Sequence, residues 1–467
     1  MKAEDTLISN RGYSFWILVF IFQISMVLLF SLEYWIPLIF LFTLILMGYS
    51  PYNLTPAIYL LIMSLFIGFY IIEKPIGIRI VDVIISVSVI TYILHKAFRG
   101  DLSIMKTSLN KPIIIFLIGI TISLFGAPQI GNGVINLLRH LELFAIFYII
   151  TDITFLEGKA IVRKMLDYYV YIATGASAVA ITMLYSLGGG RAFGVTGSPL
   201  SDLIVSALII TISQIYLRQS STQRGKYSLI AYILFVQIIM TQTRGAWLSL
   251  IIATLFLTLL LKKASIPLII KHTFWVSILF CLAIITSSTI FSNSFIGMVH
   301  RVEHLQQLNI GTLHNRLILW DAGINAFLSH FVNGIGLGHF PILSGDYSSI
   351  GNSSFFIDNI KGLSTHNIIL SYLAETGIIG TFCLLLLFMK IIQVGHSIYV
   401  SSENREDYQL SIPLYCILFY VCISSFYAGA WFWSISGVQF MFFLSLATVF
   451  RKIMKHENSH YNNHFPN

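Results

Sequence analysis

Charged residues are scarce in this chain. Only 10% of its 467 residues are Asp, Glu, Lys or Arg, whereas 56% are hydrophobic. Soluble domains carry roughly 25% charged residues, so this composition excludes an ordinary soluble protein. Repeated apolar runs of about 15 to 22 residues instead predict an all-α polytopic membrane protein. The net charge of +8 is then interpreted as topology information rather than as a sign of a nucleic-acid partner.

Cysteines and nucleotide- or metal-binding motifs are also few or missing. The chain has four cysteines, all inside apolar runs, so no disulfide framework is expected: Cys281, Cys383, Cys416 and Cys422. A Walker A loop is absent from the sequence, which argues against ATP as an energy source. No Asp-x-Asp motif or His/Glu cluster has the spacing of metal ligands. We therefore predict no metal site and no cofactor.

The apolar runs define fourteen candidate membrane spans. The second run is short for a bilayer of about 30 Å and predicts a re-entrant or broken element, so the expected number of transmembrane helices is twelve to fourteen, and even. The candidate spans are residues 13–32, 35–49, 53–72, 80–97, 112–128, 133–154, 166–187, 199–217, 227–243, 245–261, 274–292, 366–393, 411–428 and 432–450.

Basic residues predict the orientation of these spans. Under the fourteen-span count most Lys and Arg clusters fall on one side, which is therefore assigned to the cytoplasm together with both termini. Arg191, Arg244 and Arg316 are among the exceptions on the opposite side. Because they depart from the trend, these arginines need a separate explanation.

One outer connection, residues 294–365, is far longer than the others. Residues 298–308 and 316–327 have helical apolar spacing, so the loop is predicted to be partly helical. The glycine-rich stretch Asn333–Phe340 predicts flexible turns between surface helices. At the C-terminal end of the chain, the polar stretch 456–467 is predicted to be a disordered tail.

A histidine and an asparagine stand where this loop meets a membrane span. Ser364 or Thr365 is expected to cap the helix, which places His366 and Asn367 on its first turn at the membrane surface. Taken alone, the His-Asn pair could simply mark the water interface. Together with the polar residues described below, it could instead supply a titratable group to a reaction, because histidine has a reference pKa near 6.5.

Arginines on the same outer side suggest anion binding. Arg244 lies in a tight turn, Arg316 opens a predicted helix of the long loop, and Arg191 lies in a glycine-rich turn. The alternative for Arg244 is an interfacial anchor, helped by Trp247. A guanidinium keeps its charge and offers a planar fork of donors that fits phosphate oxygens. Three arginines and a histidine on the same face, against the trend of the other basic residues, suit a diphosphate-bearing lipid.

A second group of ionisable residues lies inside the 133–154 span. Arg139, His140 and Glu142 could form a relay in a transporter, since such groups are costly in a membrane and often functional. Asn132 and Gly133 precede them closely. We therefore interpret the group as structural, lying near the helix end and pairing with itself.

Three stretches, in order, resemble the motifs of the O-antigen ligase/polymerase superfamily. Arg244-Gly-Ala-Trp-Leu248 is similar to its Arg-x-x-x-Leu motif. Arg316-Leu-Ile-Leu-Trp320, followed by Gly334-Ile-Gly336-Leu-Gly338, resembles its second block, although His330-Phe331 stands where the family usually has His-Pro. His366-Asn367 resembles its His-Asn signature. This signature often ends in Gly-Thr-Gly in ligases but here reads Gly377-Ile-Ile-Gly380, which favours a polymerase.

The resemblance implies a fold, a reaction and a division of labour. The fold would be GT-C-like, with N-terminal helices (1–190), a ligase/polymerase-type core (191–393) that contains the periplasmic loop 294–365, and C-terminal helices (394–455). The enzyme would be a metal-independent glycosyltransferase of the bacterial inner membrane, with its active site facing the periplasm. Its donor would be a glycan on undecaprenyl diphosphate.

In that reaction each candidate residue has an implied role. His366 would take the proton of the attacking hydroxyl, with Asn367 in support, and Arg244, Arg316 and Arg191 would bind the diphosphate. The acceptor would be a lipid-linked repeat unit for a polymerase or lipid A–core for a ligase. A repeat-unit flippase and a chain-length regulator become candidate partners. The outsider is a membrane transporter, which would place its essential charges at mid-membrane.

Overall fold

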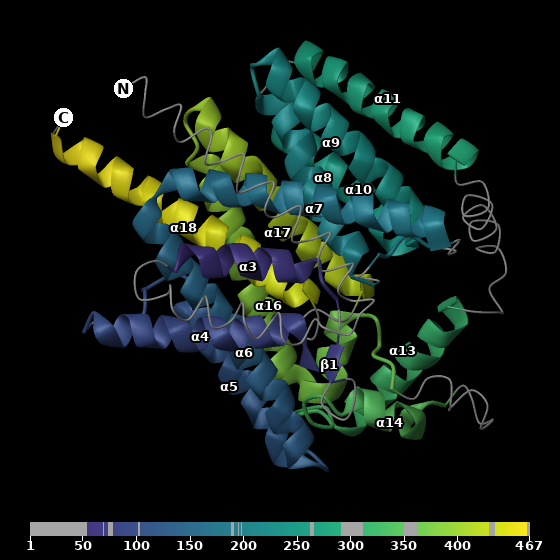
Figure 1. Ribbon diagram of the computed structural model, residues 1–467. Helices are drawn as coiled ribbons and strands as arrows, with labels where there is room; N and C mark the ends of the chain where they lie inside the picture. The colour runs from purple at the N-terminus through teal and green to yellow at the C-terminus, as the bar shows by residue number, and fades with distance from the viewer. Residues whose placement is uncertain are drawn as a thin grey trace.

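The computed structural model describes residues 54–68, 70–72, 78–100, 103–187, 191–194, 196–197, 199–261, 266–290, 312–349, 362–428 and 435–464. This part of the chain is almost entirely helical (Figure 1). A short antiparallel hairpin pairs β1 (Tyr70–Ile72) with β2 (Ile78–Arg79). The α-helices are α3 (Thr55–Leu65), α4 (Ile80–Phe98), α5 (Asn110–Ile122), α6 (Ile130–Glu157), α7 (Lys159–Leu187), α8 (Leu200–Leu217), α9 (Ser221–Met240), α10 (Arg244–Leu260), α11 (Ile266–Ile290), α13 (Thr312–Ser329), α14 (Phe340–Tyr347), α16 (Ile368–Val400), α17 (Arg405–Ala428) and α18 (Ile435–His464).

The helices confirm an all-α polytopic membrane protein. Within the described residues, eight helices are long and apolar enough to cross a membrane, and three shorter apolar helices accompany them. The first two predicted spans, 13–32 and 35–49, lie outside the described residues, as does the predicted helix 298–308. The total of twelve to fourteen crossings and the GT-C likeness therefore stay predictions.

Two predicted boundaries are wrong. The 53–72 run is not one span, because α3 ends at Leu65 and β1 follows. Gly68 passes so close to Thr196 that a Cβ atom would lie 2.2 Å from the Thr196 carbonyl oxygen, and the Thr196 hydroxyl donates to the Phe66 carbonyl. These contacts hold the chain out of the helix. At the other end of the chain, α18 continues to His464, so residues 456–464 are helical rather than a disordered tail.

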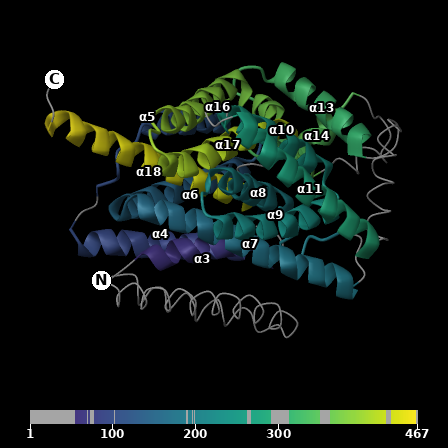
Figure 2. The same cartoon turned by 90° about the horizontal axis from the view of Figure 1, so that it is seen from above.

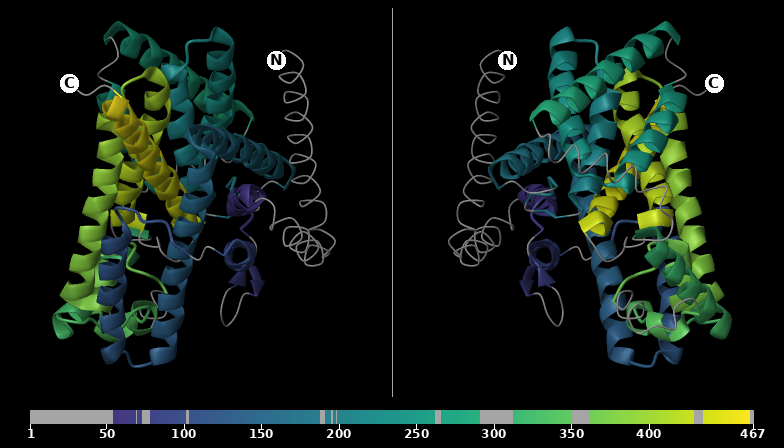
Figure 3. Two further views of the ribbon diagram at one scale, coloured as in Figure 1. Left: turned by 90° about the vertical axis from the view of Figure 1, so that its left-hand side faces the viewer. Right: turned by 90° about the vertical axis from the view of Figure 1, so that its right-hand side faces the viewer.

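The helices pack into a bundle with a small layer at one end. Helix α16 packs against α5 and α17, and α18 packs against α6 (Figure 2). Helices α13 and α14 lie at the same end of the molecule as the connection between α5 and α6 (Figure 3). A hydrogen bond joins these parts, because the Gln129 N–H donates to the imidazole Nε2 of His339. This end is the one that the basic residues assign to the outer face.

Helix α16 is broken at Gly377. This glycine has φ 62° and ψ −162°, which is not helical, and the turn is completed by another segment of the chain. The N–H groups of Ile335 and Gly336 donate to the carbonyls of Ala374 and Glu375, and the N–H of Ile378 donates to the carbonyl of Phe331. A buried backbone group without a partner is costly, so the segment 331–336 stabilises the break by supplying these bonds.

This packing corrects the interpretation of the glycine-rich stretch as flexible turns. A Cβ atom at Gly334 would lie 2.3 Å from the Glu375 carbonyl carbon, and one at Gly377 would lie 2.3 Å from the Val332 carbonyl oxygen. Ile335 and Leu337, which alternate with the glycines of this stretch, are buried. The glycines are therefore needed for close backbone contact, and the segment is tightly packed.

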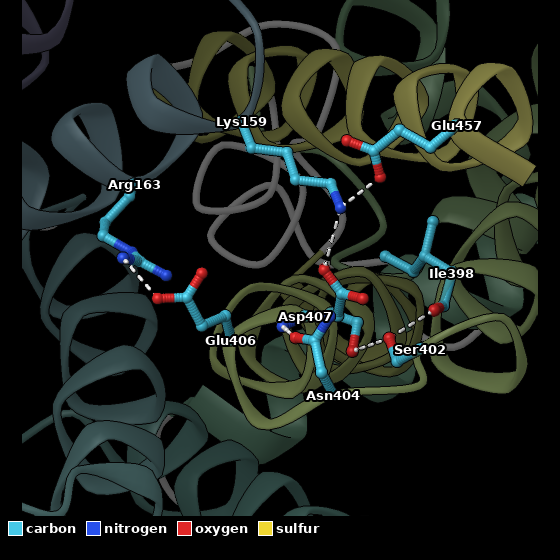
Figure 4. Close-up of polar contacts among 9 residues, drawn as sticks. Lys159, Arg163, Ile398, Ser402, Asn404, Glu406, Asp407 and Glu457 are labelled. Carbon is cyan, nitrogen blue, oxygen red and sulfur yellow. Dashed lines mark hydrogen bonds and ion pairs between the residues drawn. The ribbon is translucent and has the colours of Figure 1, made fainter. Parts of the chain in front are cut away.

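Ion pairs join three helices at the opposite end of the bundle (Figure 4). The ammonium of Lys159, at the start of α7, lies 3.1 Å from a carboxylate oxygen of Asp407 on α17 and also pairs with Glu457 on α18. Arg163, one turn further along α7, pairs with Glu406 at 3.7 Å. Asp407 is nearly buried, so its pair with Lys159 is protected from solvent screening more than the others are.

We predict that Gly377→Ala destabilises the protein more than Gly158→Ala does. The two glycines have nearly the same backbone conformation, since Gly158 has φ 75° and ψ −164°, but a Cβ atom at Gly158 would meet nothing within 4 Å. Both substitutions incur a backbone strain of about 1–3 kcal/mol. Gly377→Ala adds an overpacking cost of about 1–3 kcal/mol against Val332. Thermal unfolding of the two purified variants in detergent measures the difference, and equal melting temperatures would contradict the close packing described above.

Candidate active site

Arg244 opens α10 after a tight turn from α9. In that turn Gln242 has a positive φ of 52°, and the Thr241 hydroxyl donates to the Ile238 carbonyl. Trp247 also faces back to α9, where its indole N–H donates to the same carbonyl at 3.0 Å. Trp247 therefore fixes the first turn of α10 against the end of α9. Arg244 is left at the N-terminus of a helix, where the backbone dipole already favours anions.

Arg316 lies near the start of α13 and is half-buried. Its Nε atom is buried and has no hydrogen-bond partner among the described residues. Burial, together with the nearby positive charge of Arg244, lowers the pKa of Arg316 from its ordinary value. The two arginines, 72 residues apart in sequence, are thus close enough to repel each other. Two cations near enough to repel each other, with a buried donor that has no partner among the described residues, are groups of the kind that attract an anion.

His366 stands in the turn immediately before α16. It has φ 53°, the left-handed region that few residues other than glycine adopt. The helix begins at Ile368, and its N-cap is Asn367, whose side-chain oxygen accepts the N–H of Leu370 at 3.1 Å. The prediction of a Ser364 or Thr365 cap is therefore wrong. Because the backbone at His366 is left-handed, the helix cannot include this residue, and its cap is Asn367, two residues after Thr365.

Thr365 anchors the turn instead. Its hydroxyl accepts the Asn367 N–H at 3.2 Å and lies 2.7 Å from the Ser371 hydroxyl. The carbonyl of Thr365 accepts the indole N–H of Trp320 at 2.9 Å. Trp320 is on α13, one turn after Arg316. This bond ties the His366 turn to the helix that carries Arg316.

The two helices also touch directly. A Cβ atom at Gly323 of α13 would lie 2.9 Å from Leu370 of α16, so only a very small residue fits at this crossing. Trp320 contacts residue 365, Gly323 contacts residue 370, and Gly334 lies against residue 375, so α13 and the first part of α16 run side by side in the same direction. Arg316 and His366 are therefore carried at the same end of one two-helix unit.

Arg191 lies in a separate turn beside the α9–α10 turn. The N–H of Ala192 donates to the Met240 carbonyl at 3.1 Å, and the Gln237 side-chain amide donates to the Ala192 carbonyl. The guanidinium of Arg191 is exposed and lies over the ring of Phe193, 5.3 Å from its centroid. The structure thus brings the Arg191 turn towards Arg244. It gives Arg191 a less enclosed setting than Arg316 has.

A buried polar cluster joins His140 to α16, and its members Tyr372 and Glu375 were missed by the sequence analysis. The Nε2 atom of His140 on α6 lies 2.7 Å from the Tyr372 hydroxyl on α16, a partner outside the group in which it was predicted to pair. Glu375, one turn further along α16, is buried and accepts the backbone N–H groups of Gly338 and Phe340. A glutamate inside an apolar run, two residues before a glycine, was the signal that could have identified it.

The described residues contain no group of three or more His, Cys, Asp or Glu side chains that could hold a metal ion. Chemically, the arrangement offers fixed positive charge, a helix N-terminus and one imidazole. These are the groups expected for binding a phosphorylated substrate and moving a proton beside it.

Comparison with known proteins agrees with this arrangement. A family model described as O-antigen ligase matches residues 229–385, a region that contains Arg244, Arg316 and His366 but not Arg191. An O-antigen polymerase from Salmonella muenchen is 30% identical over 213 residues. That alignment covers 44% of this chain and 47% of the relative, so the match spans about half of each protein.

The matched region is the one that brings the two arginines together and carries the histidine turn. The family model and the similar polymerase point in the same direction as the three ordered motifs. The chain is therefore a multi-pass membrane protein whose residues 229–385 are similar to the O-antigen ligase family.

Proposed function

We propose that this protein is a glycosyltransferase of the bacterial inner membrane. It transfers a glycan from undecaprenyl diphosphate to a sugar hydroxyl during assembly of a surface polysaccharide, and its active site faces the periplasm. The observation that carries the proposal is the pair of adjacent arginines, Arg244 and Arg316, with a buried donor of Arg316 that has no partner among the described residues.

Electrostatics explains why this pair favours a diphosphate. Two like charges in a partly dry site repel each other, and each guanidinium presents several N–H donors to an acceptor. A diphosphate supplies negative charge and several oxygen acceptors at once. It would offer an acceptor to the Nε atom of Arg316 and offset the repulsion from Arg244. Arg191, exposed at the neighbouring turn, is proposed to bind the outer part of the same group.

The proposed reaction forms one bond and breaks one. The oxygen of the acceptor hydroxyl attacks the anomeric carbon of the donor, and the bond from that carbon to the diphosphate oxygen breaks. The leaving diphosphate keeps the electron pair, and the arginines stabilise its charge. His366 accepts the hydroxyl proton and later releases it to water. Asn367 supports this step by capping α16, which fixes the turn that holds His366.

A metal ion is not required in this scheme. A diphosphate is already a good leaving group, and fixed guanidinium charge in a partly buried site takes the place that a divalent cation has in other phosphate chemistry. The substrates follow from the same scheme: a lipid-linked glycan donor, a glycan acceptor and the lipid bilayer. A repeat-unit flippase and a chain-length regulator are proposed as further partners.

The acceptor distinguishes two forms of the proposal. We favour a repeat-unit polymerase, whose acceptor is another lipid-linked repeat unit. Support comes from the Gly377-Ile-Ile-Gly380 ending of the His-Asn motif and from the similarity to a protein named O-antigen polymerase. The second candidate is a ligase that joins the polymer to lipid A–core, which the description of the matching family model favours.

We predict that removing the imidazole of His366 nearly abolishes transfer but leaves donor binding largely intact. Loss of a positioned base lowers a rate by about 10²–10⁴-fold. His366→Asn is the sharper variant, because asparagine tolerates the positive φ at this position better than alanine does. His396→Ala, at the other end of α16, is the matched control. Turnover close to that of the control in His366→Asn would remove His366 from the mechanism.

We predict that Arg244→Ala and Arg316→Ala weaken donor binding as well as turnover. A hydrogen bond to a charged group contributes about 1.5–3 kcal/mol, so each variant should lose roughly tenfold or more in donor affinity. Arg244→Lys should recover only part of it, because lysine keeps the charge without the planar fork. Arg218→Ala, whose side chain bonds to Gln214 at the predicted cytoplasmic end, is the control. Unchanged donor affinity in both alanine variants would contradict the assignment.

Wild-type turnover that EDTA abolishes and Mg²⁺ restores would show that a metal carries the diphosphate instead.

We predict that cells lacking this protein keep single repeat units and lose long chains. A polymerase is needed to join repeats, whereas single repeats can still reach their acceptor through a separate ligase. Gel analysis of surface glycans and of lipid-linked intermediates, with the gene restored on a plasmid as control, makes this measurement. Accumulation of long lipid-linked polymer that is not attached to lipid A–core would instead identify a ligase.

A further inference from the structure

Glu375 is a buried carboxylate that the proposed reaction does not use. Only 5% of this residue is exposed, and its two oxygens accept different backbone N–H groups. The Oε2 atom accepts the N–H of Gly338 at 2.9 Å, and the Oε1 atom accepts the N–H of Phe340 at 3.2 Å. The backbone carbonyl of Glu375 accepts a third N–H, from Gly336, at 3.0 Å. One residue of α16 thus binds three residues of the glycine-rich segment.

The bonds of Glu375 fix the far end of the two-helix unit. The glycine-rich segment follows directly from the last turn of α13, so Glu375 holds the end of α13 against the break in α16. Trp320 holds the other end through its bond to the Thr365 carbonyl. Between them lies the close contact of Gly323 with Leu370. The register of α13 on α16 is therefore fixed at two ends by hydrogen bonds and at the middle by packing.

A second bond ties this unit to α6. His140 Nδ1 lies 2.6 Å from the Asn136 carbonyl oxygen, which can only accept, so Nδ1 carries the proton. In the neutral imidazole Nε2 is then the acceptor, and the Tyr372 hydroxyl donates to it at 2.7 Å. Asn136 also packs under the glycine-rich segment, since a Cβ atom at Gly338 would lie 1.7 Å from its amide nitrogen. Helix α6 thereby contacts both parts of the unit that Glu375 joins.

We infer that Glu375 is a positioning residue, which sets the placement of His366 relative to Arg316 with the help of the Tyr372–His140 bond. This inference rests on the proposed function. Arg316 is carried by α13 and His366 by the start of α16, so a change in the register of the two helices moves the proton acceptor relative to the bound diphosphate. Reacting groups must meet within about 3–3.5 Å, and a misplacement of 1 Å can lower a rate by about 10²-fold.

Glu375→Gln tests the inference with little change in shape. An amide has one oxygen, so only one of the two N–H groups of Gly338 and Phe340 keeps an acceptor, and the other faces an NH₂ group. We expect turnover per folded enzyme to fall about 10–100-fold. We expect the donor Kd to stay close to that of the wild type, because the arginines are unchanged. Folded enzyme is counted by size-exclusion chromatography, and the donor Kd is measured separately from turnover.

Asp407→Asn is the matched control, because Asp407 is a buried carboxylate at the opposite end of the bundle. We expect it to lower the melting temperature without changing turnover per folded enzyme. Tyr372→Phe is the second variant; it removes the bond to His140 and keeps the ring. It should lower turnover in the same direction as Glu375→Gln, and it decides the question if Glu375→Gln does not fold.

The outcomes separate this inference from the function on which it rests. If His366→Asn abolishes turnover while folded Glu375→Gln retains it, the positioning role is overturned and the proposed function stands. If Glu375→Gln does not fold and Tyr372→Phe has wild-type turnover, the positioning role is likewise overturned. If His366→Asn itself retains turnover, the proposed function fails and this inference fails with it. A loss in Glu375→Gln confined to the amount of folded enzyme would make Glu375 a stabilising residue only.

Discussion

Backbone hydrogen bonding in a membrane is the constraint on which this site depends. A helix that crosses a bilayer must satisfy its own N–H and C=O groups, so a break is tolerated only where another part of the protein supplies partners. In α16 the break at Gly377 is supplied by residues 331–336. That requirement brings a loop segment distant in sequence down onto a membrane helix, and the segment carries α13 with it. The position of Arg316 on α13 therefore depends on the backbone hydrogen bonds that residues 331–336 make at the break in α16.

Unlike these backbone hydrogen bonds, the positive charges of Arg316 and Arg244 oppose the arrangement of the site. Burial, and after it the nearby positive charge of Arg244, lowers the pKa of Arg316. The two guanidinium groups are thus near enough to repel each other when no anion is bound. An anion between them would relieve this repulsion. Binding of the proposed anionic substrate would therefore depend on the charge of both arginines.

Much of the fold could be predicted from the sequence, because hydrophobic runs report membrane spans directly. The predicted 199–217 span agrees with α8, and the predicted 133–154 span lies within α6. The sequence also located the His366 turn at the start of a helix, but the cap fell on Asn367, because a positive φ at His366 cannot be deduced from residue type. The failed 53–72 span has a similar cause, a close backbone approach between Gly68 and Thr196.

The site was less predictable than the spans because it also depends on contacts between segments distant in sequence. Arg244, Arg316 and His366 stood out as polar residues in unusual places, whereas Glu375 and Tyr372 lie inside an apolar run and act through contacts with α6 and the glycine-rich segment. A glycine spacing can indicate a turn, yet it cannot tell a mobile turn from one that packs against another backbone. That distinction requires knowing that Gly334 lies against residue 375, a contact across 41 positions of sequence.

Backbone strain occurs in the turn before Arg244 and in the turn that holds His366. Among the described residues other than glycine, a positive φ occurs at Gln242 and His366. Gln242 lies in the turn that ends at Arg244, and His366 is the proposed proton acceptor. Such conformations cost about 1–3 kcal/mol each and persist only where neighbouring contacts enforce them. Here the contacts are the bonds of Thr241 and Trp247 to Ile238 and the bond of Trp320 to Thr365. Both turns are thus held in conformations that their residues do not favour, and they are the turns that carry the proposed diphosphate-binding Arg244 and the proposed proton acceptor His366.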